Sequence, residues 1–475
     1  MATDVEVGLK QRRKAAVLGV AGAAFAAAAL AAVSAAHGAV GPITGTSPLA
    51  PPLGACLGPQ CPGLWPPPHN GDFAGRDAAI NIYAGTDFSA TGRAAEAEGK
   101  IVVLGDFTVD KTGGGIFNTG VVGVGSRVPP PDGSDFVTVG GNVTVRPTNR
   151  LEVGGVDSKG AAYGNLVYGG TATGTISLVP SGQAIQRPGA ADQYSDLRGY
   201  IEDRSECAAT APATGTVSVS PSAVTFTGDG TSLLQVFDVP GDIGGASTVG
   251  IEFNNIPAGA TVLVNMTGTA PVINTYTGTG LPGDQTTELR PRLMWNFPNA
   301  ASATIRGGAQ FQGSILGGNP AGTLSIQTPG QNGRVYVAGG LVLTNSSAGS
   351  EIHAYPFDGV LPECGTSPTS SSSTSEPTTS PTPPTNSPTT SPTTTAPSSS
   401  PSTTPSSSST TPTTAAPTLP STPSGTQPSF STRPAGRGLA ATGSSLAPAL
   451  GLAAAALSAG AAVLAFTSRK RGKHV

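Results

Sequence analysis

The sequence predicts a mainly β protein. A β-solenoid-like domain with one associated helix and a β-rich insertion is followed by a disordered stalk rich in serine, threonine and proline. Three observations carry this prediction: short β-branched runs closed by glycines, one run with helical spacing, and one long segment of Ser, Thr and Pro. The 475 residues include 66 Gly and 44 Pro, and only 11% are charged, whereas an ordinary soluble domain has roughly 25% charged residues.

Residues 1–39 have the order of a signal peptide. Four basic residues between positions 10 and 14 precede an uncharged, alanine-rich run at 15–36, and small residues follow it. We expect export by the ordinary secretory route with cleavage after this run. The alternative is a retained membrane anchor, because the run is long enough to span a bilayer.

A proline-rich lead, 40–69, precedes the region 70–364, which is the only part in which we expect a folded core with functional chemistry. That region contains 15 Lys plus Arg and 25 Asp plus Glu, so its net charge is 15 − 25 = −10. This acidic balance excludes nucleic acid as the expected partner and leaves room for calcium. No other cofactor is expected.

The repeated unit of this region is a strand, a glycine corner and a second strand. Residues 101–109, 136–145 and 334–343 each have this pattern, and the glycine pairs that begin at positions 140, 154 and 169 recur after 14 and 15 residues. Glycine permits positive φ and close backbone approach at corners, and β-branched residues suit a half-buried pleated surface. The loose period favours the coils of a β-solenoid over a glycine-rich β-sandwich, which remains the alternative.

One helix is expected between residues 190 and 208, where apolar residues recur at helical spacing. After it, segments 216–239 and 248–264 alternate like antiparallel strands and are bounded by prolines. We interpret them as a β-rich insertion between two groups of coils.

The region resembles a choice-of-anchor A domain over roughly residues 72–358. The most specific part is the Trp-Asn-Phe-Pro-Asn-Ala segment at 295–300 followed by Gly-Ser-Ile-Leu at 313–316. The resemblance implies a β-solenoid-like fold similar to ice-binding-like domains, an adhesive role, and attachment to a surface anchor such as a sortase signal. It supplies no catalytic residues. After Leu316 the chain continues Gly-Gly-Asn-Pro, where family members often continue Ala-Pro, which alters one corner.

Candidate catalytic chemistry is sparse. There is no Gly-x-Ser-x-Gly, no His-Glu-x-x-His and no Walker loop, and the exported chain keeps only His69 and His353. We expect His353 to be structural. Trp295, Phe297 and Phe311 are interpreted as core residues at a solenoid end rather than as a ligand-stacking platform.

Four cysteines remain after export, which allows three disulfide pairings outside the cell. We favour Cys56 with Cys61, because only four residues separate them. Cys207 with Cys364 would then tie the helix end to the last residue of the domain. No metal site is expected at these cysteines, because they lack short paired spacings with histidine.

Residues 365–438 are predicted to form the stalk. Of the 68 residues at 365–432, 58 are Ser, Thr or Pro and only Glu376 is charged. Such a segment cannot bury enough apolar surface to fold, and its prolines favour extended polyproline II.

Residues 439–475 have the three parts of a sorting signal. A Leu-Ala-Ala-Thr-Gly pentapeptide precedes an apolar stretch at 446–466 and a basic tail. This order resembles the cell-wall sorting signal of Gram-positive bacteria, in the form used by class E sortases, and the implied cut lies between Thr442 and Gly443. A plain membrane-anchoring helix is the alternative. The residues of the expected recognition motif are Leu439, Ala440, Ala441, Thr442 and Gly443.

Together these features predict a secreted, non-catalytic adhesin of a Gram-positive bacterium, joined to peptidoglycan by a sortase, with only transient membrane contact through 446–466. Its target is an extracellular glycan or protein. Two alternatives stay open. One is a surface-displayed carbohydrate-active enzyme, which needs two convergent carboxylates. The other is a structural or ice-binding-like coat, which needs a flat threonine face; Thr138 and Thr144 alone are too few to indicate one.

Overall fold

The computed structural model describes residues 40–366. The predicted signal peptide (1–39), the stalk beyond residue 366 and the sorting signal (439–475) with its apolar stretch (446–466) lie outside the described residues. Between residues 40 and 366, no helix has the length and apolar character needed to cross a membrane.

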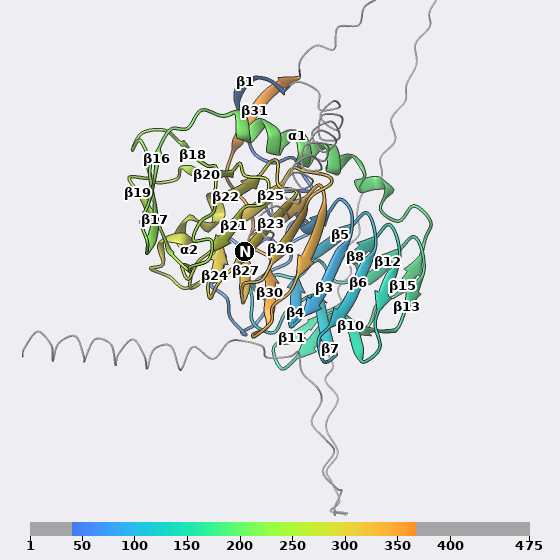
Figure 1. The fold of residues 1–475 in the computed structure, drawn as a ribbon. Coiled ribbons are helices and arrows are strands. Elements are labelled where there is room, and N and C mark those ends of the chain that lie inside the picture. Colours follow the sequence, from blue (N-terminus) through green and yellow to red (C-terminus); the bar gives the residue numbers. More distant parts are fainter. Residues whose placement is uncertain (1–39, 367–475) are drawn as a thin grey trace, which may run out of the picture. The chain divides into compact units, whose positions relative to one another are not determined.

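Most strands belong to three sheets that form the faces of a β-solenoid (Figure 1). Sheet 1 has the spatial order β15 (Ala184–Gln186), β12 (Asn165–Tyr168), β8 (Asp135–Val139), β5 (Lys100–Val103), β2 (Ile80–Ala84), β28 (Val335–Val337), β25 (Ser314–Gly317), β22 (Leu293–Phe297), β20 (Thr261–Met266) and β18 (Leu234–Val239). Sheet 2 has the order β13 (Ala172–Thr173), β9 (Val143–Val145), β6 (Phe107–Lys111), β3 (Phe88–Gly92), β29 (Gly340–Leu343), β26 (Thr323–Ile326), β23 (Ser302–Arg306) and β21 (Val272–Asn274). Sheet 3 has the order β11 (Gly160–Ala162), β10 (Asn149–Asp157), β7 (Gly115–Gly120), β4 (Ala94–Glu98), β30 (Ser350–His353), β27 (Gly330–Asn332) and β24 (Gln310–Gln312), and β14 (Thr175–Val179) also pairs with β10.

The spatial order of the coils differs from their order along the chain. The first coil, β2 to β4, pairs in parallel with β5 to β7 on one side and with the last coil, β28 to β30, on the other. The first half of the chain therefore starts in the middle of the stack and adds coils toward the β13–β15 end. The second half starts at the other end of the stack and adds coils back toward the middle. Figure 1 shows this as blue strands beside orange ones. The mainly β, solenoid-like fold predicted from the glycine-flanked strands is confirmed.

The predicted β-rich insertion is wrong for two of its strands. Strands β18 and β20 pair in parallel and extend sheet 1, and only β16 (Thr216–Val219), β17 (Ala223–Thr227) and β19 (Gly250–Asn254) form a separate, three-stranded cap sheet. Within the cap sheet β16 and β17 are antiparallel, whereas β17 and β19 are parallel. All six residues of β20 are buried, as expected for a parallel strand covered on both faces.

Helix α1 (Asp196–Thr210) overlaps the predicted helical segment 190–208, extends two residues beyond it, and follows the short 3-10 helix η1 (Asp192–Tyr194). It connects the two halves of the solenoid and packs on the outer face of sheet 1. Its Ile201 and Ala208 pack with Tyr83 and Tyr336 of that face in an apolar cluster outside the solenoid interior, which we call the second apolar cluster. The sequence did not predict the short α2 (Gln285–Leu289) or the 3-10 helix η2 (Arg290–Arg292) that follows it.

The glycine corners between sheets 1 and 2 are explained by close coil stacking. A polar ladder crosses the coils there: Asp87 Oδ1 accepts from the Asp106 N–H at 2.8 Å, Asp106 Oδ1 from Asn142 N–H at 2.7 Å, and Asn142 Oδ1 from Thr171 N–H at 2.9 Å. A Cβ on Gly141 would overlap Asp106 Oδ1. The corner thus requires glycine for space, followed by a short polar side chain for the ladder.

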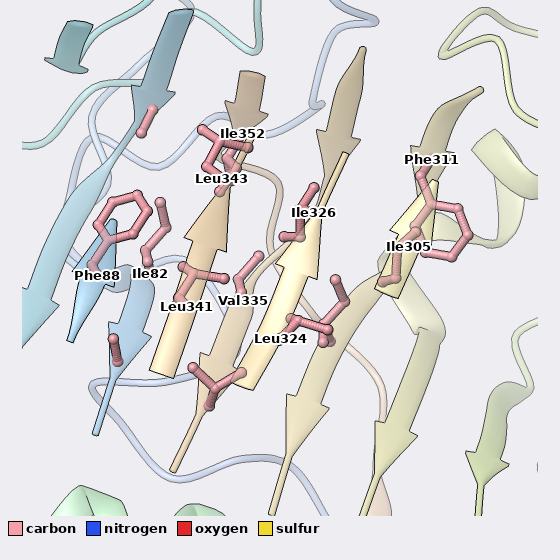
Figure 2. Close-up of a cluster of buried hydrophobic side chains, with 14 of the residues drawn as sticks. Ile82, Phe88, Ile305, Phe311, Leu324, Ile326, Val335, Leu341, Leu343 and Ile352 are labelled. Carbon is pink, nitrogen blue, oxygen red and sulfur yellow. The ribbon is translucent and has the colours of Figure 1, made fainter. Parts of the chain in front are cut away.

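The solenoid interior is filled by apolar side chains from all three sheets. Figure 2 shows Ile82 and Phe88 of the first coil beside Val335, Leu341 and Leu343 of the last coil. Trp295, Phe297 and Phe311 are each 1% exposed, so their interpretation as core residues is confirmed, and the Trp295 indole N–H donates to the Gln312 carbonyl at 2.9 Å.

The two ends of the described chain are fastened to each other. Strand β1 (Val40–Ser47) pairs antiparallel with β31 (Leu361–Thr366), and the second apolar cluster includes Leu49 and Leu53 of the segment expected to be a lead. The ordered unit therefore begins before the expected boundary at residue 70. With its own core and paired termini, 40–366 has what a domain needs to fold by itself.

Both disulfides favoured from the sequence are formed. Cys56 joins Cys61 with a Cα–Cα distance of 6.0 Å, and Cys207 of α1 joins Cys364 of β31 at 5.8 Å. The second bond fixes the end of α1 to the last strand.

Candidate binding face

The outer faces of the three sheets differ in what covers them. On sheet 1, α1 and the terminal segments bury the outward Tyr83 and Tyr336 completely. On sheet 3, the loop at 121–130 covers outward side chains such as Glu96, which is 0% exposed. The outward side chains of sheet 2 remain partly exposed, and its inward neighbours are buried. Sheet 2 therefore presents the open face of the solenoid within residues 40–366.

A single row of small side chains crosses this open face, one from each strand. The parallel register places each residue of the row directly beside the next. Six of the eight carry hydroxyl groups and the other two are valines, and none is charged; in spatial order they are Thr173, Thr144, Thr108, Ser89, Val342, Ser325, Thr304 and Val272. At 4.7–4.9 Å between strands, the row is about 33 Å long.

We call this row the hydroxyl row. Valine and threonine have few side-chain rotamers, so the methyl and hydroxyl groups of the row are held in place by the sheet. The exposed carboxylates of Asp87 and Asp106 lie at one rim, two residues before the row on neighbouring strands. The result is a regular, uncharged row on an open face, with charged or polar side chains such as Asp110 and Arg306 on the other side of the row, and it suits an extended target better than a small molecule.

The covered face of sheet 3 holds a buried polar cluster. Glu98 accepts from the Ser126 N–H at 2.9 Å and from the Ala354 N–H at 3.0 Å, so its carboxylate holds the covering loop to the sheet. His353 contacts Asn332 Oδ1 at 2.8 Å and Glu351 Oε2 at 3.1 Å, and it is 2% exposed. These contacts agree with the structural role expected for His353.

Glu96 is the most perturbed member of this cluster. Its Oε2 accepts from the Gly123 N–H at 2.9 Å, and its Oε1 has no hydrogen-bond partner. Burial, and then the negative charge of Glu351 on the neighbouring strand, raise the pKa of Glu96 well above its usual 4.5. The cluster is closed to solvent, so these carboxylates cannot meet a polysaccharide chain as the enzyme alternative would require.

Metal-ligand geometry is found at one place among residues 40–366. The sulfur atoms of Cys56 and Cys61 lie near the Asp77 carboxylate. Both sulfurs are in a disulfide, so this group cannot act as a thiolate metal site. Asp77 instead pairs with the fully buried Arg334 at 2.5 Å and accepts from the Leu57 and Ala79 N–H groups.

The structure separates the two threonines considered from the sequence. Thr138 lies on the covered face of sheet 1 and is 1% exposed, whereas Thr144 belongs to the hydroxyl row. Sequence reasoning missed the other members of the row, although a signal exists. In Phe107-Thr-Val, Val143-Thr-Val and Phe88-Ser-Ala, a small hydroxyl residue follows the first buried residue after a corner. The expected recognition motif 439–443 lies outside the part of the chain that is described.

Similarity to known proteins is found with one family and with solved structures. The family model described as "Putative Ice-binding-like adhesive domain" matches residues 77–354. The DUF3494 domain of ice-binding protein 1 from Shewanella frigidimarina is 14% identical, and the match covers 62% of this chain and 98% of that chain with a TM-score of 0.24. An ice-binding protein from an Antarctic biological consortium is 15% identical over 63% of this chain and 96% of that chain, with a TM-score of 0.21. No curated protein matches the chain.

Proposed function

Because the chain belongs to the family of ice-binding-like adhesive domains, we propose that it is a wall-anchored surface adhesin that holds an extracellular target against the open face of sheet 2. The hydroxyl row carries this proposal. It is a regular, partly exposed row that crosses all eight strands of sheet 2, whereas α1 and the loop 121–130 cover central strands of sheets 1 and 3.

The wall-anchoring part of the proposal is supported by the sequence. The resemblance to choice-of-anchor A domains and the tripartite segment 439–475 both indicate a sortase substrate joined to peptidoglycan. Replacing Thr442 with Ala should abolish covalent attachment to the wall, because the scissile carbonyl would no longer belong to the recognised residue. Cell fractionation tests this, and undiminished wall attachment of Thr442→Ala would overturn the anchoring proposal.

The target is proposed to be an extended polymer with a repeating surface, such as a glycan or a matrix protein. The side chains of the hydroxyl row are spaced at the distance between strands, so they can contact a target whose surface groups repeat along several strands. Because the row is uncharged, this contact does not depend on ionic attraction. Purified 40–366 should bind saturably to a subset of spots on a glycan and matrix-protein array, with and without calcium. The same glycan spots should be assayed for cleavage, because cleavage would support the carbohydrate-active alternative.

Matched variants connect binding to the face. Thr108→Tyr places a bulky ring at the third of the eight positions of the hydroxyl row and should weaken binding by at least about tenfold, since flat contact is lost along several strands. Thr216→Tyr makes the same change on the exposed strand β16 of the cap sheet and should leave binding unchanged. Equal binding by both variants would show that the target lies elsewhere.

Ice is the second candidate target, and the eight-strand length of the hydroxyl row favours it specifically. A regular array of hydroxyl and methyl groups can order water as well as contact a polymer. Inhibition of ice recrystallisation by 40–366, lost in Thr108→Tyr and kept in Thr216→Tyr, would establish this candidate. Binding on the array without any effect on ice growth would exclude ice as the target and support the adhesin proposal.

A further inference from the structure

The two ends of the solenoid are finished differently. At the end near the cap sheet, other segments bond to all three terminal strands: the Thr214 N–H donates to Val236 of β18 at 3.0 Å, the Ile243 N–H to Val272 of β21 at 2.9 Å, and Gln310 N–H of β24 to the Gly278 carbonyl at 3.0 Å. The packed rings of Phe226, Phe237, Phe253 and Trp295 close the core behind them. This end is capped.

The opposite end has no such cap within the described residues. It consists of β13, β14 and β15, of which β13 and β15 are labelled at the right of Figure 1. The outer edges of these strands receive no backbone hydrogen bond from another segment between residues 40 and 366. Ile176 and Leu178 on β14 face the core but are only half-buried, whereas Leu151 and Val153 on the neighbouring β10 are completely buried. The core is therefore open to solvent at this end.

The open end also lacks the devices that usually keep strand edges apart. The sixteen residues 171–186 contain no charged side chain, although exposed edges are commonly protected by charges, bulges or proline. Pro180 follows β14 rather than interrupting it. Nearby, Arg187 is the first charge after this segment and lies 3.5 Å from Asp135.

We propose that this open end is a homodimer interface, in which β14 of one copy pairs antiparallel with β14 of a second copy. An uncharged strand meets its own copy without repulsion. The five-residue β14 is longer than β13 and β15, so it offers the most backbone bonds. Centred on Ser177, its sequence Thr-Ile-Ser-Leu-Val places Ser177 opposite Ser177 and Ile176 opposite Leu178, while Thr175 meets Val179 at the two ends.

A two-fold arrangement follows from the capped opposite end. Head-to-tail stacking would require a free edge at both ends of the solenoid, whereas an isologous contact uses the same open end twice and closes. With the axis passing through β14, the strand β13 of each copy faces β15 of the other. The two hydroxyl rows then point in different directions, so the dimer adds a second binding face rather than extending the first.

Sedimentation velocity over a concentration series of 40–366 tests the proposal without any ligand. We expect a reversible monomer–dimer equilibrium. The double variant Thr175→Lys with Ser177→Lys should raise the dimer dissociation constant by at least about tenfold, because it places two lysines directly opposite each other at position 177 and two more diagonally beside them. The matched control, Thr216→Lys with Ser218→Lys on the edge strand β16, should leave it unchanged. Monomer at every concentration, or weakening by the control pair alone, would overturn the proposal.

A single-cysteine variant tests the register. All four native cysteines among residues 40–366 are in disulfides, so Ser177→Cys introduces one thiol at the proposed axis. Residues opposite each other on antiparallel strands have Cβ atoms about 4.5–5.5 Å apart, so mild oxidation should give a covalent dimer. Ser218→Cys should stay monomeric under the same conditions. Assembly beyond dimers, or a dimer that Ser177→Cys does not trap, would refute the two-fold pairing.

Discussion

Removing the two disulfides in separate variants should cost very different amounts of stability. The variants are Cys207→Ala with Cys364→Ala, and Cys56→Ala with Cys61→Ala. The bonded residues are 157 apart in the first pair and 5 apart in the second. When the stabilisation comes from loop entropy it grows with 1.5RT ln n, so the two bonds contribute about 5 and about 2 kcal/mol. The difference, 1.5RT ln(157/5), is about 3 kcal/mol, and the length-independent part of the loop entropy cancels from it.

Urea unfolding of 40–366 measures both losses. The fluorescence of the buried Trp295 reports on the core, and each variant is compared with the parent protein under the same non-reducing conditions. The Cys207 and Cys364 variant should unfold at a much lower urea concentration than the Cys56 and Cys61 variant. Equal losses would refute the argument, because they would mean that the long loop is already constrained in the unfolded chain or that local contacts dominate.

Three further changes test the buried polar groups and the corners. Glu96→Gln should raise the free energy of unfolding at neutral pH. A carboxyl group whose pKa is raised on folding stabilises the folded state fully at pH values below its ordinary pKa of 4.5, and this stabilisation is lost as the pH rises through the folded-state pKa. Glutamine is neutral at every pH and does not suffer this loss. Urea unfolding over a pH series should show a flatter profile for the variant, and an unchanged slope would contradict this. Gly141→Ala should cost about 1–3 kcal/mol by overlap at the corner, whereas Gly241→Ala, which meets no atom within 4 Å, should change the thermal midpoint little. Asp77→Ala should cost about 3–5 kcal/mol because it leaves Arg334 buried without its partner, and adding Arg334→Met should recover part of the loss in a double-mutant cycle.

The sequence contained enough information for the class of fold. Glycine pairs next to β-branched runs indicate coils because stacked backbones leave no room for a Cβ, as at Gly141. The helix at 196–210 could be predicted from the sequence because its apolar residues recur at helical spacing. The favoured cysteine pairing was found because Cys207 closes that helix and Cys364 closes the domain.

Other features depend on pairings that local patterns do not contain. Nothing in the segment 80–84 indicates that it lies beside 335–337, because any parallel strand of the same composition could occupy that position. The same degeneracy hid the assignment of 234–239 and 261–266 to sheet 1. The hydroxyl row was missed because each strand contributes only one residue, and the row exists only after the register is known.

Because the first coil lies in the middle of the stack, the coils next to the chain termini should be the most stable part of the solenoid and not the least stable. In a solenoid that winds from one end to the other, the chain termini lie in the outermost coils, which fray first and expose the rest to proteases. Here the coils nearest the chain ends, β2 to β4 and β28 to β30, pair with each other in the interior of the stack. Amide hydrogen exchange should therefore be slowest in coils adjacent to the termini, and both halves should lose their protection together once that central seam opens.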